Sequence, residues 1–309
     1  MKVLGIESTA HTFAFGLIDE YYNILEDLRI IYKPKEGIIP IEAAKFYEKN
    51  ATKLLEKIDF NKIELIGISC GPGLLPCLKI GIEIAKKIAK DFEIPLVSVN
   101  HCQAHIEIGK ILCKIRDPVI LYISGGNTQV IYYNRGYKIL GETQDIGLGN
   151  ALDKLGRVIG LKFPAGPKIE ELSKKGEFIM LPYYVKGMDL NFSGILSEAI
   201  RKIECGEKKE DILYSFQEVC FSMLAEVCER AMAATERQEL LLVGGVAQNK
   251  RLQKILRIMC EDRGAKFYVV PSQYAGDNGV MIAMTALINW KKGKITKVGI
   301  NPNWRIDSI

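Results

Sequence analysis

The stretch VLGIESTAHTFAFGLI, residues 3–18, decides the fold, because VILYISGGNTQVIYY at residues 119–133 repeats its layout. Each stretch places two short apolar runs on either side of a small polar turn, which is typical of two successive strands. A third run of the same kind follows in both places, at residues 24–31 and 137–142. The repeat predicts two similar halves that each open with three strands.

Helical patterns alternate with further strands after each set of three. We expect helices at residues 40–58, 80–89, 100–112, 150–159, 168–175, 211–236, 250–263 and 278–290, and strands at 65–69, 96–99, 240–243 and 267–270. Such alternation predicts α/β layers. We therefore expect two similar α/β domains, residues 1–120 and 121–282, around a nucleotide-binding cleft. A C-terminal helical segment, residues 283–309, is expected to pack back on the first domain.

Composition excludes several classes of protein. The chain has 309 residues, 48% of them hydrophobic, and 42 Lys+Arg against 37 Asp+Glu give a net charge of +5. These values exclude disordered, collagen-like and coiled-coil chains and permit a nucleic-acid partner. No window approaches 18 apolar residues and the N-terminus lacks a secretory pattern, so we expect a cytoplasmic protein without a membrane partner. The eight cysteines form no CxxC pair, which rules out a zinc ribbon and predicts reduced thiols.

Two of the three histidines are the first candidate site. His101 and His105 lie at i and i+4 in a predicted helix, a spacing that puts both rings on one face, within reach of one metal ion. They occupy the first turns, where the helix dipole favours the neutral, ligating imidazole. Asp277 would complete a two-histidine, one-carboxylate set for Fe(II) or Zn(II). The alternatives are hydrogen-bonded helix-face histidines and a helix-capping Asp277. Cys102 stands where a zinc protease carries its glutamate, which argues against that chemistry.

Two glycine-containing segments are candidate nucleotide contacts. Residues 124–128, SGGNT, offer backbone N–H groups and hydroxyls that suit a phosphate, although an ordinary hairpin explains them too. Residues 241–249, LLVGGVAQN, lead a buried strand into Gly-Gly and a helix, the usual nucleotide position in α/β sheets, but as a Rossmann signal this is weak. The basic clusters, for example residues 250–257, suit RNA phosphates or a solvated helix face.

Five ordered motifs together resemble one family. They are residues 5–12 (GIESTAHT), 100–107 (NHCQAHIE), 122–130 (YISGGNTQV), 243–249 (VGGVAQN) and 276–279 (GDNG). The chain is similar in these motifs to the archaeal and eukaryotic tRNA N6-threonylcarbamoyladenosine synthase subunit, the KEOPS catalytic subunit once labelled O-sialoglycoprotein endopeptidase. That family belongs to the actin-like, ASKHA (RNase H-like) superfamily.

The resemblance implies an activity and a set of site residues. The activity is transfer of the threonylcarbamoyl group from threonylcarbamoyl-adenylate to N6 of the adenosine beside the anticodon, in tRNAs reading codons that begin with A, with release of AMP. The implied metal ligands are His101, His105, Tyr122 and Asp277, the tyrosine being an iron ligand in the archaeal branch. The implied adenylate site comprises Tyr122, Ile123, Ser124, Gly125, Gly126, Asp153, Gly166, Glu170 and Asn249. Glu7 is our candidate for positioning or proton transfer near the phosphates, its alternative being a buried turn carboxylate.

The same resemblance implies partners and cofactors. We expect tRNA and the KEOPS small protein kinase and dimerising subunit as partners, one Fe(II) or Zn(II), and an ATP- or AMP-type nucleotide. Ser8 stands where archaeal members usually have Gly, and Ala165 stands where a Gly-Gly pair is usual. Two other functions stay open: a stand-alone nucleotide-hydrolysing enzyme of the superfamily, and a nucleotide-sensing scaffold in a multiprotein complex.

Overall fold

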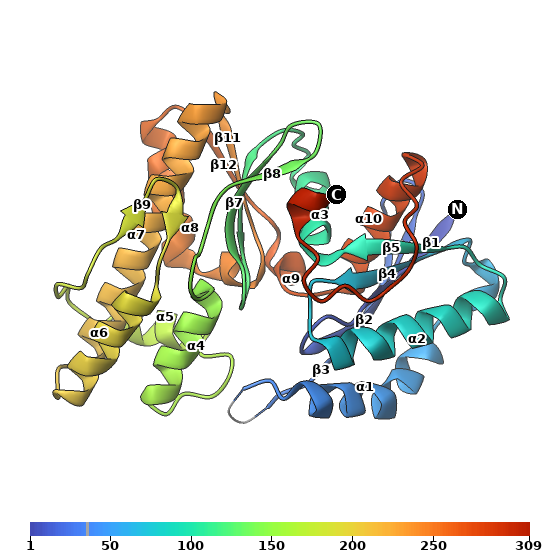
Figure 1. Ribbon diagram of the computed structural model, residues 1–309, viewed down its shortest axis with the longest axis horizontal. Coiled ribbons are helices and arrows are strands. Elements are labelled where there is room, and N and C mark those ends of the chain that lie inside the picture. The colour runs from blue at the N-terminus through green and yellow to red at the C-terminus, as the bar shows by residue number, and fades with distance from the viewer. Residues whose placement is uncertain (35–36) are drawn as a thin grey trace. The chain divides into compact units, whose positions relative to one another are not determined.

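Each half of the chain builds a five-stranded mixed sheet with the same strand order (Figure 1). The first sheet has the order β3-β2-β1-β4-β5, and the second has the order β12-β11-β6-β7-β8. In both, the three strands that come first are antiparallel neighbours and the last two pair in parallel. The bounds are β1 Lys2–Glu7, β2 Thr12–Asp19, β3 Ile24–Ile31, β4 Leu65–Gly71, β5 Leu96–Asn100, β6 Val119–Ile123, β7 Thr128–Tyr133, β8 Tyr137–Glu142, β11 Glu239–Val243 and β12 Lys266–Val269. The predicted repeat of three strands followed by alternation is confirmed.

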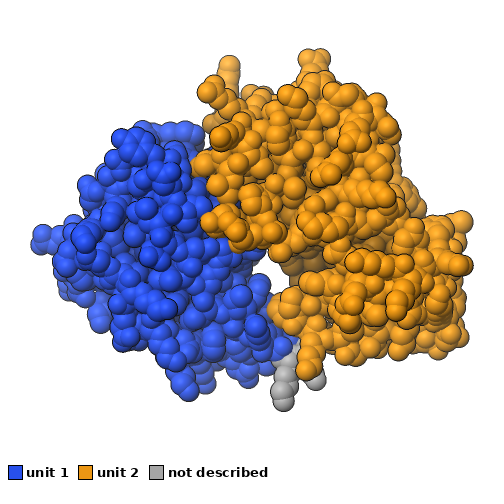
Figure 2. Space-filling view, turned by 180° about the vertical axis from the view of Figure 1, so that it is seen from behind, with its two compact units in different colours: residues 1–108, 276–309 blue, residues 109–275 orange. Residues whose placement is uncertain are grey.

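The computed structural model describes residues 1–34 and 37–309, which divide into two units (Figure 2). Unit 1 comprises Met1–Ile108 and Gly276–Ile309, and unit 2 comprises Gly109–Ala275. The sequence analysis placed the divisions at 120 and 282. In the structure the first division falls between Ile108 and Gly109, inside the helix His101–Cys113. The part of that helix after Ile108 packs on β11, because a Cβ on Gly109 would meet Val243 and Leu241. The second falls at 275/276, because the last helix packs along its whole length on the first sheet.

The helices of unit 1 are α1 Pro40–Leu55, α2 Leu75–Asp91, α3 His101–Cys113 (which extends into unit 2) and α10 Gly279–Lys291. Helix α10 approaches the first sheet backbone to backbone. A Cβ added to Gly5 on β1 would lie 2.1 Å from the carbonyl oxygen of Gly279, and one on Gly16 of β2 would lie 2.1 Å from the nitrogen of Val280. Only glycine permits that approach. The N-terminal end of α10 is thereby held against the middle of β1 and β2.

The helices of unit 2 are α4 Leu148–Val158, α5 Gly166–Ser173, α6 Ser193–Glu204, α7 Lys209–Thr235, α8 Lys250–Asp262 and α9 Ser272–Ala275. A small hairpin joins β9 Val185–Lys186 and β10 Asp189–Leu190, and short 3₁₀ turns lie at Phe60–Lys62, Gly245–Gln248 and Ile306–Ser308. The sequence analysis missed α6 and the hairpin, and it began α2 five residues late. Helix α6 starts where Asp145 accepts hydrogen bonds from the backbone N–H groups of Phe192 and Ser193, a partner far along the chain that local pattern cannot supply.

All eight cysteines are free thiols, and six of them are buried. The described part of the chain contains no helix long and apolar enough to cross a membrane.

Candidate metal centre and nucleotide site

Three side chains from two elements of unit 1 converge on one point. His101 opens α3 directly after β5, where the Asn100 side chain caps the helix by accepting from the Gln103 N–H at 3.0 Å. His105 follows one turn later, with the two ring centroids 4.7 Å apart and the rings nearly perpendicular. Asp277 precedes α10, whose first turn is capped by Asn278. The convergence joins parts of the sequence more than 170 residues apart.

The donor atoms have the spacing of a metal site. His105 Nε2 lies 3.2 Å from Asp277 Oδ1, and His101 Nε2 lies 3.5 Å from the same oxygen. The ligand atoms of all three residues lie within 4.8 Å of one another. Ligands about 2.1 Å from a tetrahedral ion stand about 3.4 Å apart, so the cluster needs little rearrangement to hold Zn(II) or Fe(II). Two imidazoles and one carboxylate are also a donor set that these ions accept.

The electrostatics prepare two of the three groups for ligation. Burial lowers the pKa of His105, which favours its neutral ring. Burial alone would raise the pKa of Asp277, but the hydrogen bond from His105 and the charge of His101 hold it below its usual range. The charge of His11 lowers the pKa of Asp277 as well, so the third histidine also lies near this cluster, which the sequence analysis missed.

His101 differs from the expectation of a neutral ring. Burial alone would lower its pKa, but the carboxylates of Glu7 and Asp277 raise it to about 9. The nearby carboxylates outweigh the weak helix-dipole effect on which the sequence argument relied. Glu7 ends β1, is fully buried, and places Oε2 3.0 Å from Nδ1 of His101. Glu7 thus contacts the cluster of His101, His105 and Asp277 through His101.

Tyr122 lies in unit 2, in the middle of the second sheet. It sits on β6 between Val243 of β11 and Gln129 of β7, and its side chain is buried. Its role as a fourth ligand stays a prediction.

The turn after β6 carries the predicted phosphate contacts Ser124, Gly125 and Gly126. Ser124 donates its N–H to the Asn127 carbonyl at 2.8 Å, and the Asn127 N–H returns a bond to the Ser124 hydroxyl at 3.1 Å. The N-terminus of α4 lies against this turn, because a Cβ on Gly147 would come within 2.4 Å of the Gly125 carbonyl oxygen. The Leu148 N–H at the start of α4 donates to the Thr128 hydroxyl at 3.0 Å, and the Asn150 N–H donates to the Gly125 carbonyl at 2.9 Å. The turn is thus bonded to the first turn of α4, where the helix dipole favours an anion.

The remaining predicted adenylate residues also lie in unit 2, on α4, on α5 and at the start of α8. Asp153 accepts the Ala165 N–H at 2.7 Å, and Glu170 accepts the Lys250 N–H at 2.7 Å. Ala165 has an ordinary right-handed backbone conformation, so its methyl group beside Gly166 brings no strain.

Asn249 makes hydrogen bonds with both polar ends of its side chain inside the unit. Its oxygen caps α8 at the Leu252 N–H, and its amide donates to Gln217, which in turn donates to Ser173. The structure therefore gives Asn249 a capping role, and its contact with an adenylate stays a prediction. Gln217 and Ser173 were missed; the one signal for them was a glutamine inside the apolar stretch of α7.

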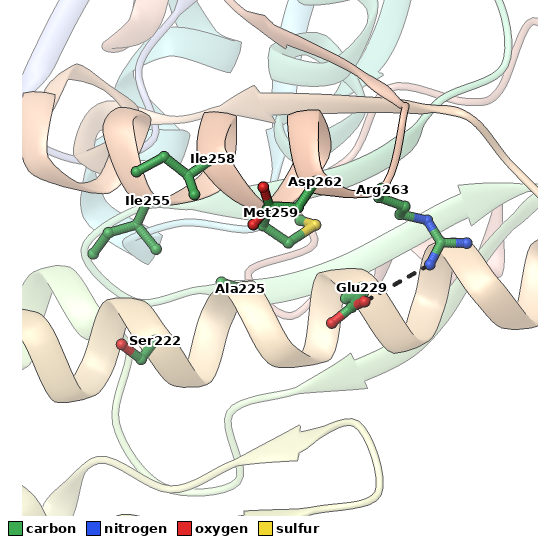
Figure 3. Close-up of a pocket in the computed structure, with 8 residues that line it drawn as sticks. All are labelled: Ser222, Ala225, Glu229, Ile255, Ile258, Met259, Asp262 and Arg263. Atoms are coloured by element: carbon green, nitrogen blue, oxygen red, sulfur yellow. Dashed lines mark ion pairs between the residues drawn. The ribbon is translucent and has the colours of Figure 1, made fainter.

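A separate hollow of about 360 Å³ lies between α7 and α8, where Glu229 and Arg263 pair at 4.0 Å (Figure 3). It contains none of the predicted site residues.

Comparison with protein families decides the assignment. Residues 22–284 match the family described as tRNA N6-adenosine threonylcarbamoyltransferase. The chain belongs to this family. A tRNA N6-adenosine threonylcarbamoyltransferase of Archaeoglobus fulgidus is 51% identical, with all of this chain and 98% of the relative covered. A probable bifunctional tRNA threonylcarbamoyladenosine biosynthesis protein of Methanocaldococcus jannaschii is 46% identical, but this chain spans only 60% of its length. The resemblance seen in the sequence is confirmed, and the protein is a transferase that modifies tRNA.

Solved structures share the fold at low identity. HypF of T. kodakarensis superposes with a TM-score of 0.65 at 16% identity, covering 96% of this chain and 48% of that one. Component A of the Acidaminococcus fermentans (R)-2-hydroxyglutaryl-CoA dehydratase gives 0.59 at 16% identity, covering 94% and 98%. These likenesses confirm the predicted ASKHA-type α/β fold.

Proposed function

We propose that this transferase moves the threonylcarbamoyl group from threonylcarbamoyl-adenylate to N6 of the adenosine beside the anticodon, in tRNAs that read codons beginning with A. N6 attacks the carbamoyl carbon and loses a proton, the bond from that carbon to the phosphate oxygen breaks, and AMP leaves with the electron pair. The observation that carries the proposal is the His101, His105 and Asp277 cluster, in a chain of a tRNA N6-adenosine threonylcarbamoyltransferase family.

The cluster in unit 1 would hold one Fe(II) or Zn(II), with Tyr122 as a proposed further ligand. When bound, such an ion supplies a Lewis acid that polarises an acyl or phosphoryl oxygen. His105 contributes a neutral ring and Asp277 an ionised carboxylate, as their pKa shifts favour. The hydrogen bonds of the Glu7 carboxylate go to His101 and to its own turn, and we give it a supporting role below.

In unit 2 the turn of Ser124, Gly125 and Gly126 would bind the phosphate of the adenylate. The positive end of the α4 helix dipole would favour the anion there without any cationic side chain. Asp153 and Glu170 are proposed to accept hydrogen bonds from the ribose. Holding the adenylate still would account for much of the rate enhancement.

Partners and location follow the family. We propose that the chain works with the KEOPS small protein kinase and dimerising subunit, in the cytoplasm. Three relatives are named as probable bifunctional tRNA threonylcarbamoyladenosine biosynthesis proteins, and this chain spans only 59–60% of their length. Their names support a second function that is joined, in those relatives, to the part that this chain matches.

The test is reconstitution with tRNA, threonylcarbamoyl-adenylate and the partner subunits, with the modified nucleoside measured by mass spectrometry. The variants His105→Ala and Asp277→Asn should lose bound metal and nearly all product while keeping a native circular-dichroism spectrum. Asp307→Asn, which removes a carboxylate of unit 1 outside the cluster, is the matched control and should stay active. Full activity in the two cluster variants would refute the metal role. Fast ATP turnover without tRNA, in protein free of metal, would favour the nucleotide-hydrolysing alternative instead.

A further inference from the structure

Glu7 carries a buried carboxylate whose hydrogen bonds lie within one small network. The residue ends β1 opposite Ala14 of β2 and is 0% exposed. A charge buried to this extent is tolerated only when its oxygens are hydrogen-bonded. Oε1 accepts the Thr9 N–H at 2.7 Å and the Thr9 hydroxyl at 2.5 Å, and Oε2 faces Nδ1 of His101 at 3.0 Å.

The network determines which ring nitrogen of His101 carries a proton. The Thr9 hydroxyl has one hydrogen, and it points to Glu7 Oε1. Toward His101 Nδ1, 3.2 Å away, the Thr9 oxygen is therefore an acceptor. Nδ1 thus faces two acceptors, one from Glu7 and one from Thr9, and it must donate.

A proton held on Nδ1 leaves the other nitrogen for ligation. Nε2 of His101 is on the side of Asp277, 3.5 Å from Oδ1. A ligating histidine whose second N–H is held by a carboxylate has a fixed tautomer, a fixed ring orientation and a more basic ligand atom. Glu7 is placed to give this support to His101.

We propose that Glu7, clamped by Thr9, is a positioning residue: it holds His101 in the Nδ1–H form with Nε2 turned to the metal, and so sets the affinity of the centre. This role rests on the metal centre proposed above. It replaces the proton-transfer role considered from the sequence, because both Glu7 oxygens are already committed to groups of the protein.

Glu7→Gln tests the role with almost no change in shape. The two Thr9 donors require the amide oxygen on their side, so the NH₂ group faces His101 Nδ1. That donor favours the opposite tautomer, with a proton on Nε2 where the metal would bind. We expect Zn(II) affinity, measured by competition with a chromophoric chelator, to fall about 10- to 100-fold. In the zinc-loaded parent, an exchange-protected imidazole N–H proton of His101 should appear in the NMR spectrum, and in the variant it should be lost or displaced.

Two further variants complete the experiment. Glu218→Gln removes a carboxylate that is 14% exposed and pairs with Arg251 in unit 2, and it should leave zinc affinity unchanged. Thr9→Val keeps the carboxylate but removes the hydroxyl, and it should weaken binding about three- to tenfold; it decides the matter if Glu7→Gln fails to fold. If Glu7→Gln folds and binds zinc as tightly as the parent, the positioning role is overturned. If Glu7→Gln does not fold, parent-like zinc affinity in Thr9→Val overturns it. A parent that binds no metal would instead overturn the proposed centre itself, and this inference with it.

Discussion

Gly81→Ala is expected to destabilise unit 1, although alanine is the better helix former. Gly81 lies inside α2, and a Cβ there would stand 1.9 Å from the Ser8 hydroxyl oxygen and 2.6 Å from Ser8 Cβ. Replacing glycine by alanine in a helix interior raises the free energy of unfolding by about 1 kcal/mol through helix propensity. Overpacking of this kind costs about 1–3 kcal/mol, so the balance should be a loss of up to about 2 kcal/mol.

The same substitution should change sign once Ser8 is replaced by glycine. Without the Ser8 side chain, the next atom near the new methyl group is Ile68 Cδ1 at 3.5 Å, an ordinary contact. In the Ser8→Gly background, Gly81→Ala should then raise the free energy of unfolding by about 0.5–1 kcal/mol. Ser8→Gly alone should be nearly neutral. It removes a buried hydroxyl that has no hydrogen-bond partner among the described residues, and it adds backbone entropy to the unfolded chain.

Urea unfolding followed by tryptophan fluorescence is the assay, because both tryptophans, Trp290 and Trp304, belong to unit 1. The four proteins of the double-mutant cycle give the coupling free energy directly. An unchanged dependence of the unfolding free energy on urea would show that only stability has changed. Equal effects of Gly81→Ala in the parent and in the Ser8→Gly background would refute the reasoning.

Three further outcomes follow from unit 2. Burial alone would raise the pKa of Asp145, but hydrogen bonds, chiefly from the Ser193 hydroxyl, lower it to about 2. Asp145→Asn should cost about 1–2 kcal/mol at pH 7, as the loss of a helix cap does. Because the folded pKa is the lower one, the difference from the parent should persist above about pH 4 and vanish as pH falls toward 2, in unfolding followed by circular dichroism; a pH-independent difference would contradict it. Gly147→Ala should displace the turn at Gly125, whose carbonyl oxygen would lie 2.4 Å from the new Cβ, and should weaken AMP binding in calorimetry, whereas Gly194→Ala, with open space around it, should not. Cys205, the one cysteine that is exposed, should react with a thiol reagent in the native protein, and reaction of the six buried cysteines should need unfolding; fast labelling of a buried thiol would count against the burial pattern.

The elements found from the sequence were those with strong local patterns. Strand triplets, the helix that begins at His101 and the strand before Gly244 follow from apolar periodicity and caps that lie within a few residues. Helix α6 was missed because its first N–H groups bond to Asp145, nearly fifty residues earlier. The hydrogen bond from the Asn249 amide to Gln217 was not foreseen, because that partner becomes visible only when α7 and α8 pack. The contact of Asn249 with an adenylate stays a prediction.

The sequence by itself determined the repeat, the ASKHA-type fold, the tRNA-modifying family and the helical spacing of His101 and His105, because each depends on residues close together or on motifs in a fixed order. The tertiary structure decided that Asp277 reaches those histidines, that His11 lies nearby, and that Glu7 contacts His101. The reason is packing: Gly5 and Gly16 let the start of α10 come against the backbone of β1 and β2, and this brings the carboxylate within 3.5 Å of both rings. Glycines and a carboxylate so far apart in the chain show no local pattern that would reveal the contact.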